Sequence, residues 1–156
     1  MTPPAVTLQG ADQATWRTYF EATRLLLDEL DRRLHEDAGI SLADYGLLSK
    51  LATADEWGMR MGELAEGTVS SRSRISHAVD RLEGMGWVER RACPTDRRGS
   101  YAALTEAGRR KLAEAEPGLS EVVRRHLLDH LTPGEGRFEE VMAAVRDSLP
   151  TGASRG

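Results

Sequence analysis

The segment SRSRISHAVDRLEGMGWVERRACPTDRRGSYAALTEAG, residues 71–108, contains the most informative pattern in this chain. Apolar residues at three- and four-residue steps predict a helix from Ser71 to Gly84. Two strand-like runs follow, 87–92 and 100–104, around a turn at 93–99 that contains Pro, Asp and Gly. This order of elements predicts a helix that fits one groove of DNA and an arginine-tipped hairpin that fits the next.

The predicted helix has two different faces. One face is apolar and narrow, and consists of Ile75, Ala78, Val79 and Leu82. The other face and the start of the helix supply the expected DNA contacts: Ser71, Arg72, Ser73, Arg74, Ser76, His77 and Arg81. The major groove accepts one helix, and side chains near its N-terminus reach the base edges. The alternative is an ordinary solvated face of a surface helix.

The hairpin tip favours DNA over a merely solvated face. It contains Asp96, Arg97 and Arg98, and it is too small to fill a major groove. An arginine at such a tip suits a narrow minor groove, where negative potential is concentrated. The helix and the hairpin therefore stand in the order that a winged helix needs.

Charge is distributed unevenly along the chain. The 156 residues carry a net charge of -4, yet residues 70–110 contain nine Arg and only five acidic residues. Residues 1–69 contain twelve acidic and six basic residues, and residues 111–156 contain eight and six. Phosphate binding depends on the local field, so the basic middle remains compatible with a nucleic-acid partner.

Other features of composition exclude several classes of protein. No apolar run is long enough to span a bilayer, and the N-terminus lacks the pattern of a signal peptide. The single cysteine, Cys93, rules out a disulfide within the chain, so we expect a cytoplasmic protein. No phosphate-binding glycine loop, nucleophile elbow or convincing acid pair is present, and we expect neither an enzyme nor a cofactor.

The remaining sequence predicts further helices. The first is expected at 12–37, and a capping box of Ser41 and Asp44 marks the start of the second. The others are expected at 62–66, from Thr105 to about Leu131, and at 134–149. Pro117 and Gly118 are expected to kink the fourth of these. The predicted fold class is mainly α with a small β-hairpin: a winged helix-turn-helix lobe at 41–111, dimerisation helices at 12–38 and 112–150, and flexible ends at 1–11 and 151–156.

Several motifs together resemble the MarR-type winged-helix regulators. They are MGELAEGT at 61–68, SRSRISHAVDRLEGMGWVER at 71–90 and DRRGSYAALTEAGRR at 96–110. The resemblance implies a homodimeric transcription factor, most often a repressor, on a pseudo-palindromic operator. It also implies that Arg98 enters the minor groove, that Asp96 holds it or its neighbour, and that Arg97 meets phosphate. His77 departs from the family, which commonly has Arg there.

The apolar residues of the outer helices support a dimer independently of the resemblance. A small winged-helix core cannot bury all of them, and exposed they would form a large apolar patch. A second copy would cover them, whereas the alternative is that they complete the core of a monomer. The residues in question are Trp16, Tyr19, Phe20, Leu27, Leu34, Leu127, Leu131, Phe138 and Val141.

Other residues give weaker hypotheses. The resemblance implies an effector pocket between the dimerisation helices and the lobe, and Trp16, Tyr19, His35 and Tyr45 are candidates to bind a small aromatic ligand, although each could equally be core. His126 and His130 would share one helix face, but no third ligand is evident, so no metal site is predicted. Cys93 is more simply an ordinary thiol than an oxidant sensor. A protein-interaction module that meets an acidic partner is the alternative from another functional class.

Overall fold

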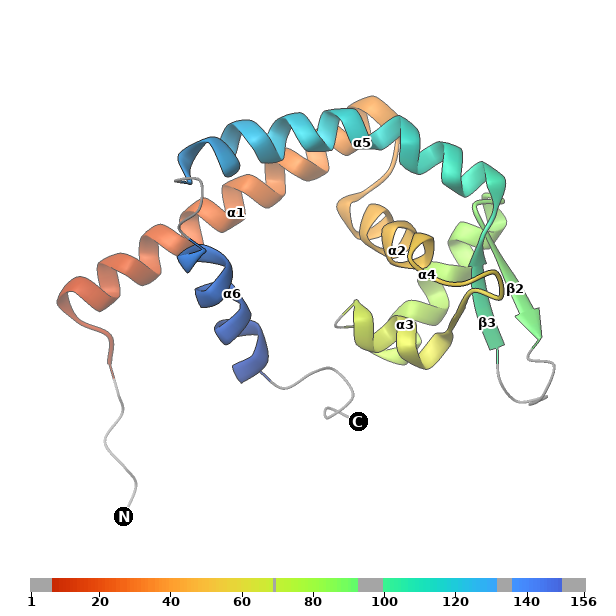
Figure 1. The fold of residues 1–156 in the computed structure, drawn as a ribbon, viewed down its shortest axis with the longest axis horizontal. Helices are drawn as coiled ribbons and strands as arrows, with labels where there is room; N and C mark the ends of the chain where they lie inside the picture. Colours follow the sequence, from red (N-terminus) through yellow and green to blue (C-terminus); the bar gives the residue numbers. More distant parts are fainter. Residues whose placement is uncertain (1–6, 69, 93–99, 132–135, 150–156) are drawn as a thin grey trace, which may run out of the picture.

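A mainly helical fold with one small sheet is seen in the computed structural model, which describes residues 7–68, 70–92, 100–131 and 136–149. Two long helices run side by side above a compact lobe that contains the sheet (Figure 1). The elements, in chain order, are α1 (Gly10–Ala38), α2 (Leu42–Ala52), β1 (Met59–Arg60), α3 (Met61–Gly67), α4 (Arg72–Gly84), β2 (Val88–Ala92), β3 (Ser100–Leu104), α5 (Glu106–His126), the 3-10 helix η1 (Leu128–His130) and α6 (Arg137–Ser148).

The two long helices are α1 and α5. α1 begins at Gly10, two residues before the predicted start, and ends where Gly39 takes a left-handed conformation with φ of 66°. α5 continues through Pro117 and ends at His126, earlier than predicted, because Leu127 leaves the helical conformation with φ of -128° and ψ of -65°. Its axis bends along the way in Figure 1, as the proline in its interior leads one to expect.

The predicted capping box at the start of α2 is confirmed. The Ser41 hydroxyl accepts a hydrogen bond from the Asp44 amide at 3.1 Å, and the Ser41 amide donates to the Asp44 carboxylate at 3.4 Å. α1 adds a third contact, because the Leu42 amide donates to Asp31 Oδ1 at 2.7 Å. The start of the lobe is thereby fixed to the long helix that precedes it.

The sheet has three antiparallel strands in the order β1-β3-β2. The hairpin of β2 and β3 was predicted, and its register pairs Val88 with Leu104 and Ala92 with Ser100. The third strand is β1, which precedes α3 and places Met59 opposite Ala102. This extra strand ties the hairpin to the helix-turn-helix formed by α3 and α4.

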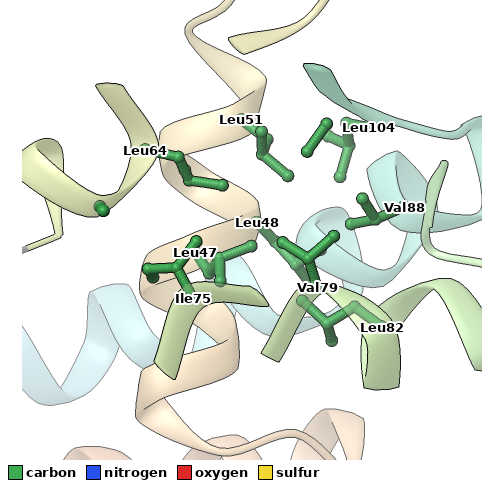
Figure 2. Close-up of a cluster of buried hydrophobic side chains, with 11 residues drawn as sticks. Leu47, Leu48, Leu51, Leu64, Ile75, Val79, Leu82, Val88 and Leu104 are labelled. Atoms are coloured by element: carbon green, nitrogen blue, oxygen red, sulfur yellow. The ribbon is translucent and has the colours of Figure 1, made fainter. Parts of the chain in front are cut away.

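The main core lies inside the lobe (Figure 2). Leucines of α2 and α3, the apolar face of α4 and residues of the hairpin point toward one another there. The labelled members are Leu47, Leu48, Leu51, Leu64, Ile75, Val79, Leu82, Val88 and Leu104. A smaller cluster of Leu34, Ala38, Ile40 and Ala115 joins α1 to α5. The predicted inward face of α4 is thus confirmed.

Much of the predicted apolar face of α1 is exposed in the single chain. Leu30 and Leu34 are buried, so Leu34 belongs to the chain's own core and not to the surface patch predicted for it. Trp16, Tyr19 and Phe20 are 43–53% exposed, and α6 has no buried residue. Figure 1 shows the first half of α1 extending beyond the lobe, with α6 projecting near it. Among the residues that the structure describes, no helix combines the length and hydropathy needed to cross a membrane.

Candidate nucleic-acid interface

The N-terminal turn of α4 presents a cluster of polar and basic side chains to solvent. Ser71 is the N-cap, and its hydroxyl accepts a hydrogen bond from the Arg74 amide at 3.4 Å. Arg72, Ser73 and Arg74 follow and are all exposed, while Ile75 turns into the core. These exposed residues are therefore supported by a helix whose opposite face is firmly packed.

Arg72 and Arg74 are available for an external partner. Within the described part of the chain, neither guanidinium forms an ion pair or a side-chain hydrogen bond. Unpaired amides and the helix dipole add positive potential at the same helix end. Arginine binds phosphate or the edge of guanine through two parallel hydrogen bonds, and this helix end is suited to such contacts.

His77 lies about one turn further along α4 and is exposed on the outward side. When a helix lies in the major groove, a side chain one turn from its N-terminus can still contact the DNA. The position is therefore compatible with the predicted contact.

Arg81 does not present a free guanidinium. Its two terminal nitrogens lie 2.6 and 2.9 Å from the two carboxylate oxygens of Asp44 in α2. The Asp44 side chain is only 7% exposed, whereas that of Arg81 is 49% exposed. Burial opposes ionisation of Asp44, but hydrogen bonds from Arg81 and Ser41 prevail and lower its pKa below the ordinary value. The geometry favours a structural role for Arg81 over the DNA contact predicted from its position.

Ser76 also faces another part of the protein. It is half-buried, and both its carbonyl and its hydroxyl oxygen lie 3.3 Å from Nη2 of Arg90 in β2. Arg90 therefore covers the side of α4 on which Ser76 lies. The sequence does not predict the pairing of Asp44 with Arg81 or of Arg90 with Ser76, because each pair joins two different elements and no local spacing marks it.

The predicted tip of the wing, with Asp96, Arg97 and Arg98, lies outside the described residues, as does Cys93. The structure does describe the strands on both sides, β2 to Ala92 and β3 from Ser100. Their pairing of Ala92 with Ser100 brings the two ends of the segment 93–99 together. The predicted roles of the three tip residues remain predictions.

The four residues predicted to bind an effector do not come together within one chain. Trp16 and Tyr19 stack loosely at 6.0 Å near the start of α1, and roughly 28 Å of helix separates Trp16 from His35 at 1.5 Å per residue. Tyr45 lies in α2, where its hydroxyl donates to Glu116 at 2.8 Å. These residues do not form a site within one chain, and an aromatic effector site built from them remains a prediction.

The predicted pairing of His126 and His130 on one helix face is wrong. α5 ends at His126, and His130 belongs to the separate 3-10 helix η1, because the conformation of Leu127 breaks the helix between them. Within the ranges that the structure describes, no group of three or more metal-ligating side chains comes together.

Comparison with known proteins places these features in context. A model of the MarR family matches residues 38–99. The crystal structure of Sco3205, a MarR family transcriptional regulator from Streptomyces coelicolor in complex with DNA, is 44% identical and has a TM-score of 0.89, over 94% of this chain and 92% of that one. AbsC, a MarR family regulator from the same organism, is 33% identical with a TM-score of 0.86, over 92% of this chain and 97% of that one. The transcriptional repressor MprA of Escherichia coli is 34% identical over 51% of this chain, and the match spans 45% of its length.

Proposed function

Because this chain belongs to the MarR family of transcriptional regulators, we propose that it acts as a homodimeric repressor that binds a pseudo-palindromic operator. It is a winged-helix regulator and not an enzyme. The observation that carries the proposal is the N-terminal turn of α4, where Arg72 and Arg74 are exposed on a helix that the core holds in place. The 44% identical relative Sco3205, crystallised in complex with DNA, supports it.

In the proposed complex the start of α4 enters the major groove. Ser71, Ser73 and the two arginines face the bases or the flanking phosphates, and His77 reaches the same groove one turn later. The wing enters the neighbouring minor groove with Arg98, while Arg97 meets phosphate and Asp96 orients an arginine. The pairing of β2 with β3 supports this role, since it delivers segment 93–99 from the same lobe.

The proposed dimer uses the outer helices, 12–38 and 112–150. Trp16, Tyr19 and Phe20 on α1, together with Phe138 and Val141 on α6, are 41–53% exposed in one chain. A second copy would remove this apolar surface from water and would set two α4 helices about one turn of DNA apart. An effector site formed by Trp16, Tyr19, His35 and Tyr45 would then require both chains, and release by a small aromatic ligand is part of the proposal.

The test is binding of the purified protein to DNA from upstream of its own gene and to a random duplex, by fluorescence anisotropy across a salt series. We expect operator binding at least about a thousandfold tighter than random binding, with a salt slope that reports several phosphates. Sedimentation at the same concentrations should show a dimer. Weak binding that is equal on both duplexes would contradict the proposal and would favour a protein-interaction module in the cytoplasm.

The wing has its own arm in this test. Arg98→Ala should weaken operator binding by more than a few-fold while the dimer remains folded, because a minor-groove contact is lost. Unchanged affinity would reject the assignment of Arg98 to the minor groove.

A further inference from the structure

Arg90 forms a clasp between the hairpin and α4. Its Nη2 lies 2.5 Å from Asp80 Oδ1 and 3.3 Å from both the carbonyl and the hydroxyl oxygen of Ser76. Its Nε lies 3.5 Å from Glu83 Oε2, and its backbone amide donates to Glu83 Oε1 at 3.1 Å. One side chain of β2 thus holds three residues on successive turns of α4.

The other side of Arg90 is fixed as well. Its backbone pairs with Ala102 of β3, so the clasp begins on the strand pair that leads to the wing. The Arg90 side chain is 28% exposed, which limits the screening of its contacts by water. A planar guanidinium with several donors in fixed directions suits this geometry better than a flexible ammonium group would.

We infer that Arg90 is a positioning residue for DNA binding, which holds the recognition helix α4 and the strand pair β2–β3 at a fixed relative orientation without itself contacting DNA. The inference rests on the proposed function, in which α4 and the wing enter neighbouring grooves. Binding of α4 in one groove favours binding of the wing in the next only when the wing is already positioned for that groove. When these elements are already oriented in the free protein, the free-energy cost of ordering them on binding is smaller.

Charge alone predicts a different behaviour, and this makes the inference testable. Asp80 and Glu83 place two negative charges on the same helix whose N-terminus is proposed to bind DNA. Simple electrostatics says that removing these charges strengthens DNA binding. The proposed role of Arg90 predicts weaker DNA binding instead, because both carboxylates hold Arg90 against α4.

The first experiment compares wild type, Arg90→Gln and Arg90→Lys on operator and random duplexes across a salt series. We expect Arg90→Gln to lose about tenfold or more in operator affinity, with little change in salt slope and a smaller loss on random DNA. Arg90→Lys should recover part of the loss. A salt slope reduced by about one, with equal losses on both duplexes, would identify a direct phosphate contact and overturn the inference.

The second experiment uses the double variant Asp80→Asn with Glu83→Gln, which keeps Arg90 and removes its charged acceptors. We expect weaker operator binding, and tighter binding would overturn the clasp. Glu89→Gln is the matched control, because Glu89 pairs with Arg91 on the same strand and lies outside the clasp. If Arg90→Gln does not fold, as judged by circular dichroism and thermal unfolding, the double variant Asp80→Asn with Glu83→Gln tests the role of Arg90.

The two proposals fail in different ways. A wild-type protein that shows no preference for its upstream DNA would refute the proposed function. A wild-type protein that prefers it, together with an Arg90→Gln variant of equal affinity and preference, would refute only the role of Arg90.

Discussion

The guanidinium of Arg81 lies across the buried carboxylate of Asp44, with its two terminal nitrogens 2.6 and 2.9 Å from the two oxygens. The same carboxylate accepts the amide and the hydroxyl of Ser41, at 3.4 and 2.7 Å. Asp44 therefore stabilises the start of α2 and also anchors the last turn of α4. Through it α4 is attached to α2, by a different residue from those that Arg90 contacts.

The ion pair of Asp44 and Arg81 should stabilise the fold. Asp44→Asn removes the charge that two arginine nitrogens and Ser41 bind, and we expect a loss of about 2 kcal/mol in the free energy of unfolding at pH 7, less than for a fully buried pair because Arg81 is half-exposed. Urea denaturation at one fixed protein concentration measures it. Asp28→Asn is the control, since Asp28 forms an exposed pair with Arg24 and should change stability by under about 0.5 kcal/mol.

The same pair gives a pH dependence of defined sign. The pKa of Asp44 is lowered in the folded state, so its contribution is fully present above the unfolded value of about 3.9 and is lost as the pH falls through the lower folded value. The stability difference between wild type and Asp44→Asn should therefore be constant from about pH 5 to 7 and should shrink below about pH 4. A difference that grows on acidification would contradict the assignment.

Gly108 should tolerate no side chain. A Cβ at this position would lie 2.2 Å from the carbonyl oxygen of Trp87, which is backbone and cannot move aside cheaply. Gly108→Ala should destabilise the protein by about 2 kcal/mol or more in urea denaturation. Gly84→Ala is the matched control, because no atom lies within 4 Å of its Cβ, and it should be neutral or slightly stabilising. Equal effects of the two substitutions would be incompatible with this packing.

The exposed aromatic residues of α1 should hold the proposed dimer together. Phe20→Asp places a charge on a side chain that is 53% exposed in one chain and lies 5.7 Å from the Trp16 ring, so it should convert the dimer largely to monomer. Analytical ultracentrifugation over a range of concentrations measures this. Arg109→Asp, at an exposed position of α5 outside the proposed dimerisation helices, controls for the added negative charge. A Phe20→Asp protein that sediments as an unchanged dimer would exclude this face from the interface.

His77 should limit the affinity of the recognition helix. His77→Arg adds a permanent positive charge at an exposed site of α4, and we expect binding to tighten by about threefold to tenfold, with a salt slope larger by about one. Anisotropy titrations at several salt concentrations provide both quantities. His130→Arg on η1 makes the same change of charge away from the lobe. Unchanged binding of the His77 variant would place this position outside the DNA contact.

The sequence predicted most of the helices and the hairpin because their signals are local. The apolar face of α4, with Ile75, Val79 and Leu82, has a helical period, and the Ser41 capping box is read from two residues. The end of α5 was missed, since the run from Leu127 to Leu131 remains apolar enough to continue a helix although Leu127 leaves it. The third strand at Met59 could not be assigned from two residues.

The candidate site was only partly predictable from sequence. Exposure of Arg72 and Arg74 follows from their positions relative to the apolar face, and the structure agrees. The partners of Arg81 and Ser76 do not follow, because Asp44 is 37 residues from Arg81 and Arg90 reaches Ser76 from another element. A helical projection shows which side chains point outward, but it cannot show which of these another element already holds.

Base reading by the start of α4 is best tested by the affinities of wild type and Arg74→Ala for the operator and for a random duplex, measured across a salt series. We expect Arg74→Ala to lose about 1–3 kcal/mol of binding free energy on the operator and much less on random DNA, so that base preference falls. Arg110→Ala, at an exposed arginine of α5 that pairs with Glu106 outside the proposed dimerisation helices, should change neither. Equal losses on the two duplexes, or no loss, would contradict base reading by the start of α4.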